Sequence, residues 1–422
     1  MAAGFQTIDQ ILHADGVALA RIADTCGTPC YVYSSSQLDQ NVEGLKSAMR
    51  RALPASDQPL IAFACKANSN LGILHHMAGL GLGADVVSGG EMIRAQAAGI
   101  DPARIIFSGV GKTDEDIEQA LRAHIAQINI ESAPELERVT AIAQHIGITA
   151  RIAFRLNPDV DAQTHAKITT GKEDNKFGLA AQDIAPLYRH AVQRRFVDVL
   201  GLSVHIGSQL TSLEPFREAF SKTAAFARQL VADGLPLRSL DLGGGLGIVY
   251  DREQAPCLDG YASLIRELIL PLGVKIILEP GRLLVGNAGL LLTRVTYIKK
   301  TSTRQYLVLD AGMNDLVRPA LYDAWHEIRP VVDNATNNEL YDVVGPVCET
   351  GDTFARDRAL PPLQAGTLLA IMNAGAYGFS MSSRYNARPL PAEVMTRNGH
   401  FRVIRQRENV RDILKEETIP AW

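Results

Sequence analysis

The octapeptide FACKANSN, Phe63–Asn70, joins a predicted strand to a predicted helix. The apolar run Leu60–Ala64 has the composition of a buried strand, and Leu71–Met77 reads as a helix. Lys66 therefore lies where a strand ends. A lysine held there partly out of water has a lowered pKa, so that some free amine is present to attack a carbonyl. Taken alone, a lysine at a strand end is more often a solvated surface residue than a catalytic one, so the role of Lys66 depends on the rest of the chain.

Length and composition limit the class of protein. At 422 residues the chain suits one large domain and one smaller domain. The net charge of -4, with scattered basic residues, does not indicate a nucleic acid or an anionic membrane as partner. The amino terminus lacks the basic segment and apolar core of a signal peptide, so we expect a cytoplasmic protein.

Cysteine usage argues against a disulfide framework and against a structural metal. The five cysteines are an odd number in a large chain of cytoplasmic character. Cys26 and Cys30 have no second cluster with which to complete a zinc site. We therefore expect no metal.

Short apolar runs alternate with amphipathic stretches from residue 59 onward, as in repeated strand-helix units of a parallel sheet. Eight strands followed by helices favour a closed (β/α)8 TIM barrel over an open sheet. The predicted strands are Leu60–Ala64, Ala84–Val87, Arg104–Phe107, Ala126–Ile130, Arg151–Leu156, Leu200–His205, Ser239–Leu242 and Lys275–Leu278. The predicted helices between them include Glu91–Ala98, Asp114–Arg122, Pro134–Ile146, Ala181–Arg194 and Pro215–Ala232.

The helical pattern nearly stops after Gly281, which predicts a C-terminal β-rich domain of sandwich or barrel type. Its predicted strands are Leu290–Ile298, Tyr306–Asp310, Leu340–Gly345, Thr367–Met372 and Phe401–Ile404. We expect residues 31–280 to form the barrel, and residues 1–30 and 281–422 the β-rich domain.

Two further segments carry expectations of their own. The apolar runs Leu283–Val285 and Leu290–Leu292 are too short and too interrupted to span a membrane, and we expect two buried strands there. The polar, glycine-containing stretch Asp159–Gly178 predicts a functional or mobile loop.

Reactive residues gather where the predicted strands end, and in a barrel these ends converge on one mouth. Lys66 follows the first strand and Asp85 lies in the second. His205 ends the sixth, and Gly243–Gly245 follow the seventh. The three glycine amides allow a phosphate to approach without side chains in the way, although a tight structural turn explains a glycine triplet equally well. The spacing does not fit a dinucleotide fingerprint, because Ile248 occupies the last glycine position.

Glu279 follows the eighth predicted strand, where an unpaired charge is costly. A pyridinium nitrogen would supply its partner. His205 is either a satisfied core histidine or a flat face for an aromatic ring. An amine, a phosphate cradle, a carboxylate for a ring nitrogen and an imidazole for a ring face together describe a site for pyridoxal 5'-phosphate.

The chain resembles the barrel-type pyridoxal-phosphate decarboxylases of basic amino acids, most closely their diaminopimelate branch. The resemblance covers Tyr31 to about Tyr385, and all its motifs occur in the expected order. The motifs are Cys65–Asn68, Gly83–Ser88, His205–Gln209, Gly243–Gly245, Glu279–Arg282, Gly345–Thr350 and Gly375–Tyr377.

The resemblance implies a role for each matching residue. Lys66 is the implied covalent attachment point of the cofactor and Cys348 the implied proton donor, although a buried free thiol is the alternative for Cys348. The implied cofactor-binding set is Lys66, Asp85, His205, Ser208, Gly243, Gly244, Gly245, Glu279, Gly281 and Tyr377. The resemblance also implies a homodimer in which Cys348, Glu349 and Tyr377 come from the partner chain.

The implied substrate-binding set is Arg282, Arg318, Tyr322, Glu349 and Tyr377. An arginine fork holds a carboxylate through two bonds, whereas ornithine and lysine have no distal carboxylate. We therefore expect decarboxylation of meso-2,6-diaminopimelate to L-lysine and CO2, the last step of lysine synthesis. An amino-acid racemase and a non-catalytic cofactor carrier are the alternatives. The Cys348–Glu349 pair argues against the first, and the presence of a second domain argues against the second.

Overall fold

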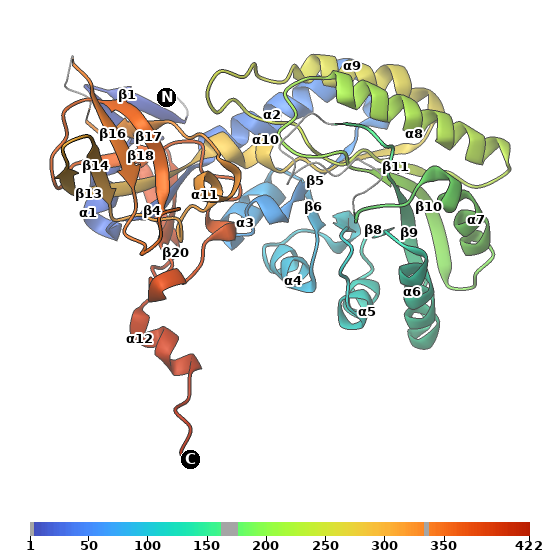
Figure 1. The fold of residues 1–422 in the computed structure, drawn as a ribbon. Coiled ribbons are helices and arrows are strands. Elements are labelled where there is room, and N and C mark those ends of the chain that lie inside the picture. The colour runs from blue at the N-terminus through green and yellow to red at the C-terminus, as the bar shows by residue number, and fades with distance from the viewer. Residues whose placement is uncertain (1–3, 162–175, 333–336) are drawn as a thin grey trace. The chain divides into compact units, whose positions relative to one another are not determined.

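The computed structural model describes residues 4–161, 176–332 and 337–422 and divides into two compact units (Figure 1). One unit contains Asn41–Val249 and Glu253–Leu284. The other contains Met1–Gln40, Tyr250–Arg252 and Val285–Trp422. The domain limits suggested by the sequence, 31–280 against 1–30 with 281–422, stay a prediction.

The first unit is built on eight parallel strands that close into a barrel, which confirms the predicted (β/α)8 fold. Around the barrel the strands follow the order β10-β11-β12-β5-β6-β7-β8-β9. Their bounds are β5 Leu60–Ala64, β6 Gly83–Val86, β7 Ile105–Phe107, β8 Gln127–Ile130, β9 Ala150–Leu156, β10 Val197–Val204, β11 Ser239–Asp241 and β12 Lys275–Leu278. A small apolar cluster of Ala62, Ile106 and Ile277 forms part of the barrel core.

Helices lie outside the barrel strands (Figure 1). They are α2 Ser35–Ala52, α3 Leu71–Gly79, α4 Gly89–Ala97, α5 Asp114–Arg122, α6 Ala133–Ile146, α7 Ala181–Val192, α8 Glu214–Ala232, α9 Leu258–Leu268 and α10 Arg282–Val285. Local sequence determines where they begin. In α5, for example, the Thr113 side chain accepts from the Asp116 amide and Asp116 accepts from the Thr113 amide, a complete capping box. Short 3-10 helices include Ala55–Asp57, Cys65–Ala67, Pro102–Arg104 and Leu270–Leu272.

The second unit is β-rich, as predicted. Its larger sheet has nine strands: β4 Cys30–Ser34, β13 Gly289–Lys300, β14 Gln305–Leu309, β15 Ile328–Pro330, β16 Glu339–Val344, β17 Thr353–Leu360, β18 Leu368–Ile371, β19 Ala392–Arg397 and β20 His400–Arg405. β1 Phe5–Ile8, β2 Ile11–Ala14 and β3 Val17–Ala18 form a second sheet. The helices are α1 Leu19–Cys26, α11 Arg318–Tyr322 and α12 Val410–Ile413. Because β4 pairs with both β13 and β19, the N-terminal segment is part of this unit.

The structure corrects one of the strand predictions and supplies strands that the sequence pattern did not reveal. Leu283–Val285 belongs to helix α10 instead of a strand, and the Leu284 amide donates to the Gly281 carbonyl at 3.0 Å. Three apolar residues are too few to distinguish a strand period from a helical one. Strands β17 and β19 were not predicted, because Arg356, Asp357 and Arg358 or Glu393 interrupt their apolar pattern. Most of the predicted loop Asp159–Gly178 lies outside the described residues.

Within the described part of the chain, no helix combines the length and the apolar character needed to span a bilayer.

Gly244 shows how closely the barrel loops approach one another. A Cβ atom added to Gly244 would lie 2.1 Å from the backbone carbonyl oxygen of Glu279. Because that neighbour is backbone, no side-chain rotation relieves the clash. We expect Gly244→Ala to lower the free energy of unfolding by about 3 kcal/mol.

A matched control is Gly79→Ala, at the end of α3, where an added Cβ meets no heavy atom within 4 Å. We expect this control to be neutral or stabilising by up to about 1 kcal/mol. Urea unfolding of both variants, without added ligand, measures the difference. Equal unfolding free energies in the two variants would contradict the proposed close approach.

Candidate active site

Lys66 lies in the 3-10 helix Cys65–Ala67, between β5 and α3. Its Nζ is 3.2 Å from Oδ2 of Asp85, whose side chain is fully buried at the end of β6. The other Asp85 oxygen, Oδ1, is also buried and has no hydrogen-bond partner among the described residues. Buried polar atoms are nearly always satisfied, so a partner for Oδ1 is expected. The Lys66 side chain keeps 33% of its surface exposed, which leaves its amine accessible.

His205 follows β10 and is held as a neutral ring. The Gly244 amide donates to its Nδ1 at 3.2 Å, so Nδ1 is an acceptor and the ring proton resides on Nε2. Burial lowers the pKa of His205 well below its usual range, and the charges of Lys66 and Arg155 act in the same direction. The ring therefore offers an uncharged flat face.

The loops after β10 and β11 pair with each other through their backbones. The Leu210 amide donates to the Gly245 carbonyl, and the Gly247 amide donates to the Leu210 carbonyl, both at 2.9 Å. Gly243 has a φ of +65°, and a Cβ there would lie 2.4 Å from the Val204 carbonyl oxygen. No side chain therefore fits at the start of this loop, and its backbone is open to a close ligand.

Three further predicted residues of the barrel unit lie beside these loops. Nη2 of Arg282 donates to Oγ of Ser208 at 3.1 Å, which links the end of β12 to the loop after β10. A Cβ on Gly281 would lie 3.1 Å from the side chains of Ala64 and Ala67, on either side of Lys66. Ser208, Gly281 and Arg282 thus belong to the same end of the barrel as Lys66.

Glu279 is buried, with 6% of its surface exposed, directly after β12. Ser108 Oγ donates to its Oε1 at 3.3 Å. Burial raises the pKa of the Glu279 carboxyl well above its usual range, and the nearby carboxylates of Asp241 and Asp85 raise it further. The raised pKa favours the neutral form of the Glu279 carboxyl.

Several polar residues at this end of the barrel were not predicted as site residues. Arg155 Nη1 donates to Glu131 Oε1 at 2.6 Å. Asn129 donates to both Ser108 and Asp241 at 3.0 Å. One available signal was the alternation of Gln127 and Asn129 with isoleucines in a short strand, which places two amides on its inner face.

Glu91, in the first turn of α4, was also not predicted. Its Oε2 accepts from the Val87 amide at 2.9 Å. Burial raises the pKa of Glu91 to about 7, and the negative charge of Asp85 contributes in the same direction.

The β-rich unit holds the other predicted residues, beginning with Arg318 in α11. Arg318 is buried, its guanidinium lies 4.6 Å from the centre of the Tyr250 ring, and its Nη1 is 2.8 Å from Nε2 of His326. Because arginine only donates, Nε2 accepts and Nδ1 of His326 donates to the Met372 carbonyl at 2.8 Å. Arg318 is therefore fixed in one orientation. Tyr322, at the end of the same helix, is half-buried.

Cys348 and Glu349 lie in an exposed loop of the same unit. The Cys348 amide donates to Oδ1 of Asn386 at 2.9 Å, and the Tyr385 hydroxyl donates to Oε2 of Glu349 at 2.8 Å. Residues 385 and 386 thus contact the Glu349 side chain and the Cys348 backbone, respectively. Tyr377 has a φ of +55°, an uncommon conformation for a residue with a side chain.

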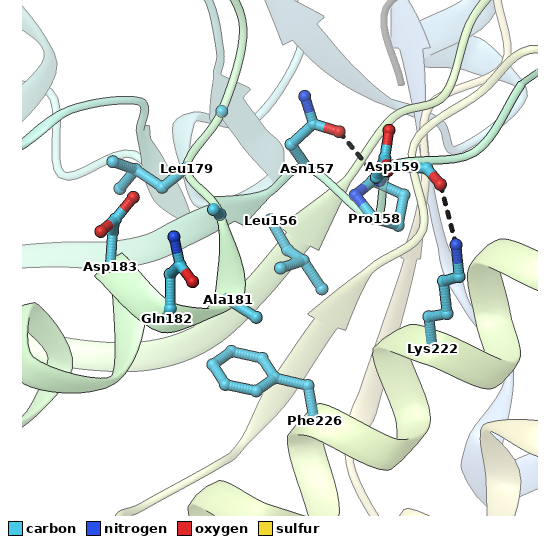
Figure 2. Close-up of a pocket in the computed structure, with 12 residues that line it drawn as sticks. Leu156, Asn157, Pro158, Asp159, Leu179, Ala181, Gln182, Asp183, Lys222 and Phe226 are labelled. Carbon is cyan, nitrogen blue, oxygen red and sulfur yellow. Dashed lines mark hydrogen bonds between the residues drawn. The ribbon is translucent and has the colours of Figure 1, made fainter. Parts of the chain in front are cut away.

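A separate hollow of about 680 Å³ in the barrel unit lies away from these residues (Figure 2). Figure 2 shows Lys222 reaching to the Asp159 carbonyl, with Phe226 beneath, and the hydrogen bond is 2.8 Å long. None of the predicted site residues lines it. It borders a segment outside the described residues, so we assign it no function.

Comparisons with known proteins match the barrel unit to one family and nearly the whole chain to individual relatives. Residues 40–286 match the family "Pyridoxal-dependent decarboxylase, pyridoxal binding domain". The diaminopimelate decarboxylase of Pseudomonas aeruginosa is 46% identical over 98% of this chain and 99% of its own length. That of Neisseria meningitidis serogroup A is 47% identical over 96% of this chain and 98% of its own length.

Solved structures agree over the whole chain. The M. jannaschii diaminopimelate decarboxylase in complex with L-lysine superposes with a TM-score of 0.94 at 38% identity, covering 99% of this chain and 98% of that one. The Helicobacter pylori enzyme with L-lysine gives a TM-score of 0.90 at 43% identity, covering 94% and 98%. The chain belongs to the pyridoxal-dependent decarboxylases, within the diaminopimelate decarboxylase family.

Proposed function

We propose that this protein decarboxylates meso-2,6-diaminopimelate to L-lysine and CO2, using pyridoxal 5'-phosphate, as the last step of lysine synthesis in the cytoplasm. One observation carries the proposal. An accessible lysine amine lies 3.2 Å from a buried aspartate at the same end of a barrel as a protonated glutamate and a neutral histidine. Two similar solved proteins are named as complexes with L-lysine, the product of this reaction.

The residues present fit the cofactor. Asp85 Oδ1 is a buried acceptor with no hydrogen-bond donor among the described residues. The loop at Gly243–Gly245 has no side chains, so a phosphate can approach its backbone closely. The Gly243 and Gly244 amides already donate to Asp241 and His205. Lys66 would hold the cofactor covalently, Ser208 and the glycine amides its phosphate, Glu279 its ring nitrogen and His205 its ring face. Bound pyridoxal phosphate supplies an electron sink for the pair left behind when CO2 departs.

The chain's own residues then have distinct tasks. Asp85 keeps the Lys66 amine at the end of β5, where it is ready to bond and to be displaced. Glu279 would face the ring nitrogen and accept a hydrogen bond from it, which favours the protonated ring. Because His205 is neutral, it packs against a cationic ring without repulsion. Cys348 Sγ delivers a proton to the carbon that has lost CO2.

We further propose that the site is completed in a homodimer, where the partner chain supplies Cys348, Glu349 and Tyr377. Arg282, Arg318, Tyr322 and Glu349 select the substrate. The guanidinium of Arg318 is buried and fixed, so it is pre-organised for a carboxylate at the far end of the substrate. A substrate that ends in an ammonium would be repelled.

Substrate assays test the reaction itself. Purified protein with pyridoxal phosphate should release CO2 from meso-diaminopimelate much faster than from ornithine or lysine. Lys66→Ala should reduce turnover to below about one thousandth and remove the visible absorbance of the bound cofactor. The exposed Lys275 provides the matched control, and Lys275→Ala should change neither. Release of CO2 from ornithine but not from diaminopimelate would refute the substrate, and full turnover by Lys66→Ala would refute the mechanism.

Subunit mixing tests the shared site. Lys66→Ala and Cys348→Ala should each be inactive, but co-expressed they should recover about a quarter of wild-type activity, because half of the dimers carry one intact site. Lys66→Ala co-expressed with Glu279→Gln is the control, since both residues come from the barrel unit. Recovery in the control pair, or none in the first, would contradict partner completion.

Arg318→Lys tests substrate selection. Lysine keeps the charge but loses the stacking on Tyr250 and the planar fork. We expect KM for meso-diaminopimelate to rise about 10- to 100-fold with little change in kcat, which is the signature of lost uniform binding. Arg329→Lys, on β15, should behave as wild type. An unchanged KM in Arg318→Lys would show that Arg318 does not contact the substrate.

A further inference from the structure

A chain of polar side chains crosses the interior of the barrel. Ser239 Oγ donates to Gln127 Oε1 at 3.2 Å, and Gln127 Nε2 donates to Asn129 Oδ1 at 2.7 Å. All three residues are buried. Because each amide uses its oxygen as acceptor and its nitrogen as donor, the chain has one direction, and Asn129 must point its NH2 group toward the carboxyl end of the strands.

This series of hydrogen bonds ends at the Asn129 NH2 group, which donates to two acceptors. It donates to Asp241 Oδ2 at 3.0 Å and to Ser108 Oγ at 3.0 Å. The Ser108 hydroxyl then has its proton available for Glu279 Oε1, at 3.3 Å. Asn129 thus orients both Asp241 and, through Ser108, Glu279.

Asp241 and Glu279 are both buried at the ends of the paired strands β11 and β12, where Asn129 and Ser108 connect them. Contact between the two carboxyls raises the pKa of Glu279 and counteracts the rise in that of Asp241. Two carboxyl groups in such contact share one proton, because like charges at that distance in a dry site cannot both persist. Asp241 also accepts from the Gly243 amide at 3.0 Å, so it has two donors that stabilise its charged form. Glu279 has the single donor Ser108 among the described residues. The charge therefore resides on Asp241 and the proton on Glu279.

Other charges also face the pair, although the division of charge follows from the hydrogen-bond donors. Asp85, on β6, raises the pKa of both carboxyls, whereas Lys66 lowers that of Glu279. Burial is the largest cause in each case. Tyr261, on α9, is a buried neutral phenol whose pKa is raised by burial and by Asp241.

We propose that Asp241, oriented by Asn129, is a positioning residue for Glu279, and that their shared proton fixes the orientation of the Glu279 carboxyl toward the cofactor ring nitrogen. This inference rests on the proposed function, because the ring nitrogen that Glu279 would contact belongs to the proposed cofactor. When Glu279 accepts a hydrogen bond from a protonated ring nitrogen, the shared proton moves along the existing hydrogen bond to Asp241. One O–H bond breaks on Glu279 and one forms on Asp241, so the pair keeps a single negative charge.

A purely structural role for Asp241 predicts different results. A residue that only fills the barrel interior would affect stability, but it would alter neither the proton on Glu279 nor the affinity for the cofactor. Infrared spectroscopy of protonated carboxyls and cofactor titration separate the two roles.

The first experiment uses wild-type protein and needs no variant to fold. In the cofactor-free protein, at a pH above the pKa values of Glu91 and Asp315, the C=O stretching band of a protonated buried carboxyl should remain. Glu91, whose pKa is about 7, and Asp315, whose pKa is about 6, should both be ionised at that pH and contribute no band. Glu279→Gln should remove the band and thereby assign it.

Adding pyridoxal phosphate to wild-type protein tests the proton shift directly. The difference spectrum should show the band moving in frequency while its intensity persists, because the proton passes to Asp241. Loss of the band on cofactor binding, or its absence in the free protein, would overturn the inference.

Asp241→Asn tests the positioning role. An asparagine cannot accept from both Asn129 and the Gly243 amide through separate oxygens, so it leaves two donors facing each other. We expect the Kd for pyridoxal phosphate to rise about tenfold or more, and the Glu279 band to disappear at a lower pH than in wild type. Ser239→Ala, at the far end of the chain, is the matched control and should keep the band and a Kd within about twofold of wild type.

The outcomes distinguish this inference from the proposed function. If Glu279→Gln weakens cofactor binding but Asp241→Asn does not, the positioning role of Asp241 is wrong and the proposed function stands. If Glu279→Gln itself binds pyridoxal phosphate as tightly as wild type, the cofactor role of Glu279 is wrong, and the proposed site with it.

Discussion

Three carboxyl groups buried beside one lysine impose the main physical constraint on this protein. Asp85, Asp241 and Glu279 lie at the carboxyl end of the barrel, where an unpaired charge costs several kcal/mol. Lys66 neutralises Asp85, and Asp241 is stabilised by two hydrogen-bond donors. Glu279 then remains neutral by keeping a proton. Each carboxyl avoids its charge penalty by a different route, and these routes give the three groups different chemical properties.

The barrel supplies the geometry that this arrangement needs. Neighbouring parallel strands place residues of similar register at one end, so residues far apart in the sequence, such as Asp85, Asn129 and Asp241, converge there. Glycines let the loops after β10 and β11 pair closely, and the same pairing holds His205 as a neutral ring through the Gly244 amide. The conformation of the loops and the electrostatics of the site are therefore linked.

The sequence revealed the barrel because its strands are nearly continuous apolar runs and their helices have clear beginnings, as at Thr113. Lys66 and Glu279 could be predicted as site residues because charged residues at the ends of apolar strands are conspicuous. The hydrogen-bonding partner of Glu279 was not identified. Asp241 lies within the predicted strand Ser239–Leu242, and only the pairing of β11 with β12 brings it close to Glu279.

Local pattern also failed where spacing in sequence does not report contact. The Tyr385 hydroxyl reaches Glu349 across 36 positions, and strand β17 carries charged residues that interrupt any apolar alternation. The apolar run Leu283–Val285 fits the period of a strand as well as that of a helix. It becomes helical because Pro280 and Gly281 end the preceding segment. These features depend on tertiary contacts, which a single sequence does not encode locally.

Most of the proposed reaction residues lie in the barrel unit, and most of the residues proposed to select the substrate lie in the β-rich unit. Cys348 and Arg282 are the exceptions, since Cys348 belongs to the β-rich unit and Arg282 to the barrel unit. The charges of Lys66, Asp85 and Glu279 do not depend on the far end of a substrate, since all three residues lie in the barrel unit. Arg318 and Glu349 belong to the β-rich unit, where Tyr250, His326 and Tyr385 fix their orientation. Replacing residues 318 and 349 would therefore leave the electrostatics within the barrel intact.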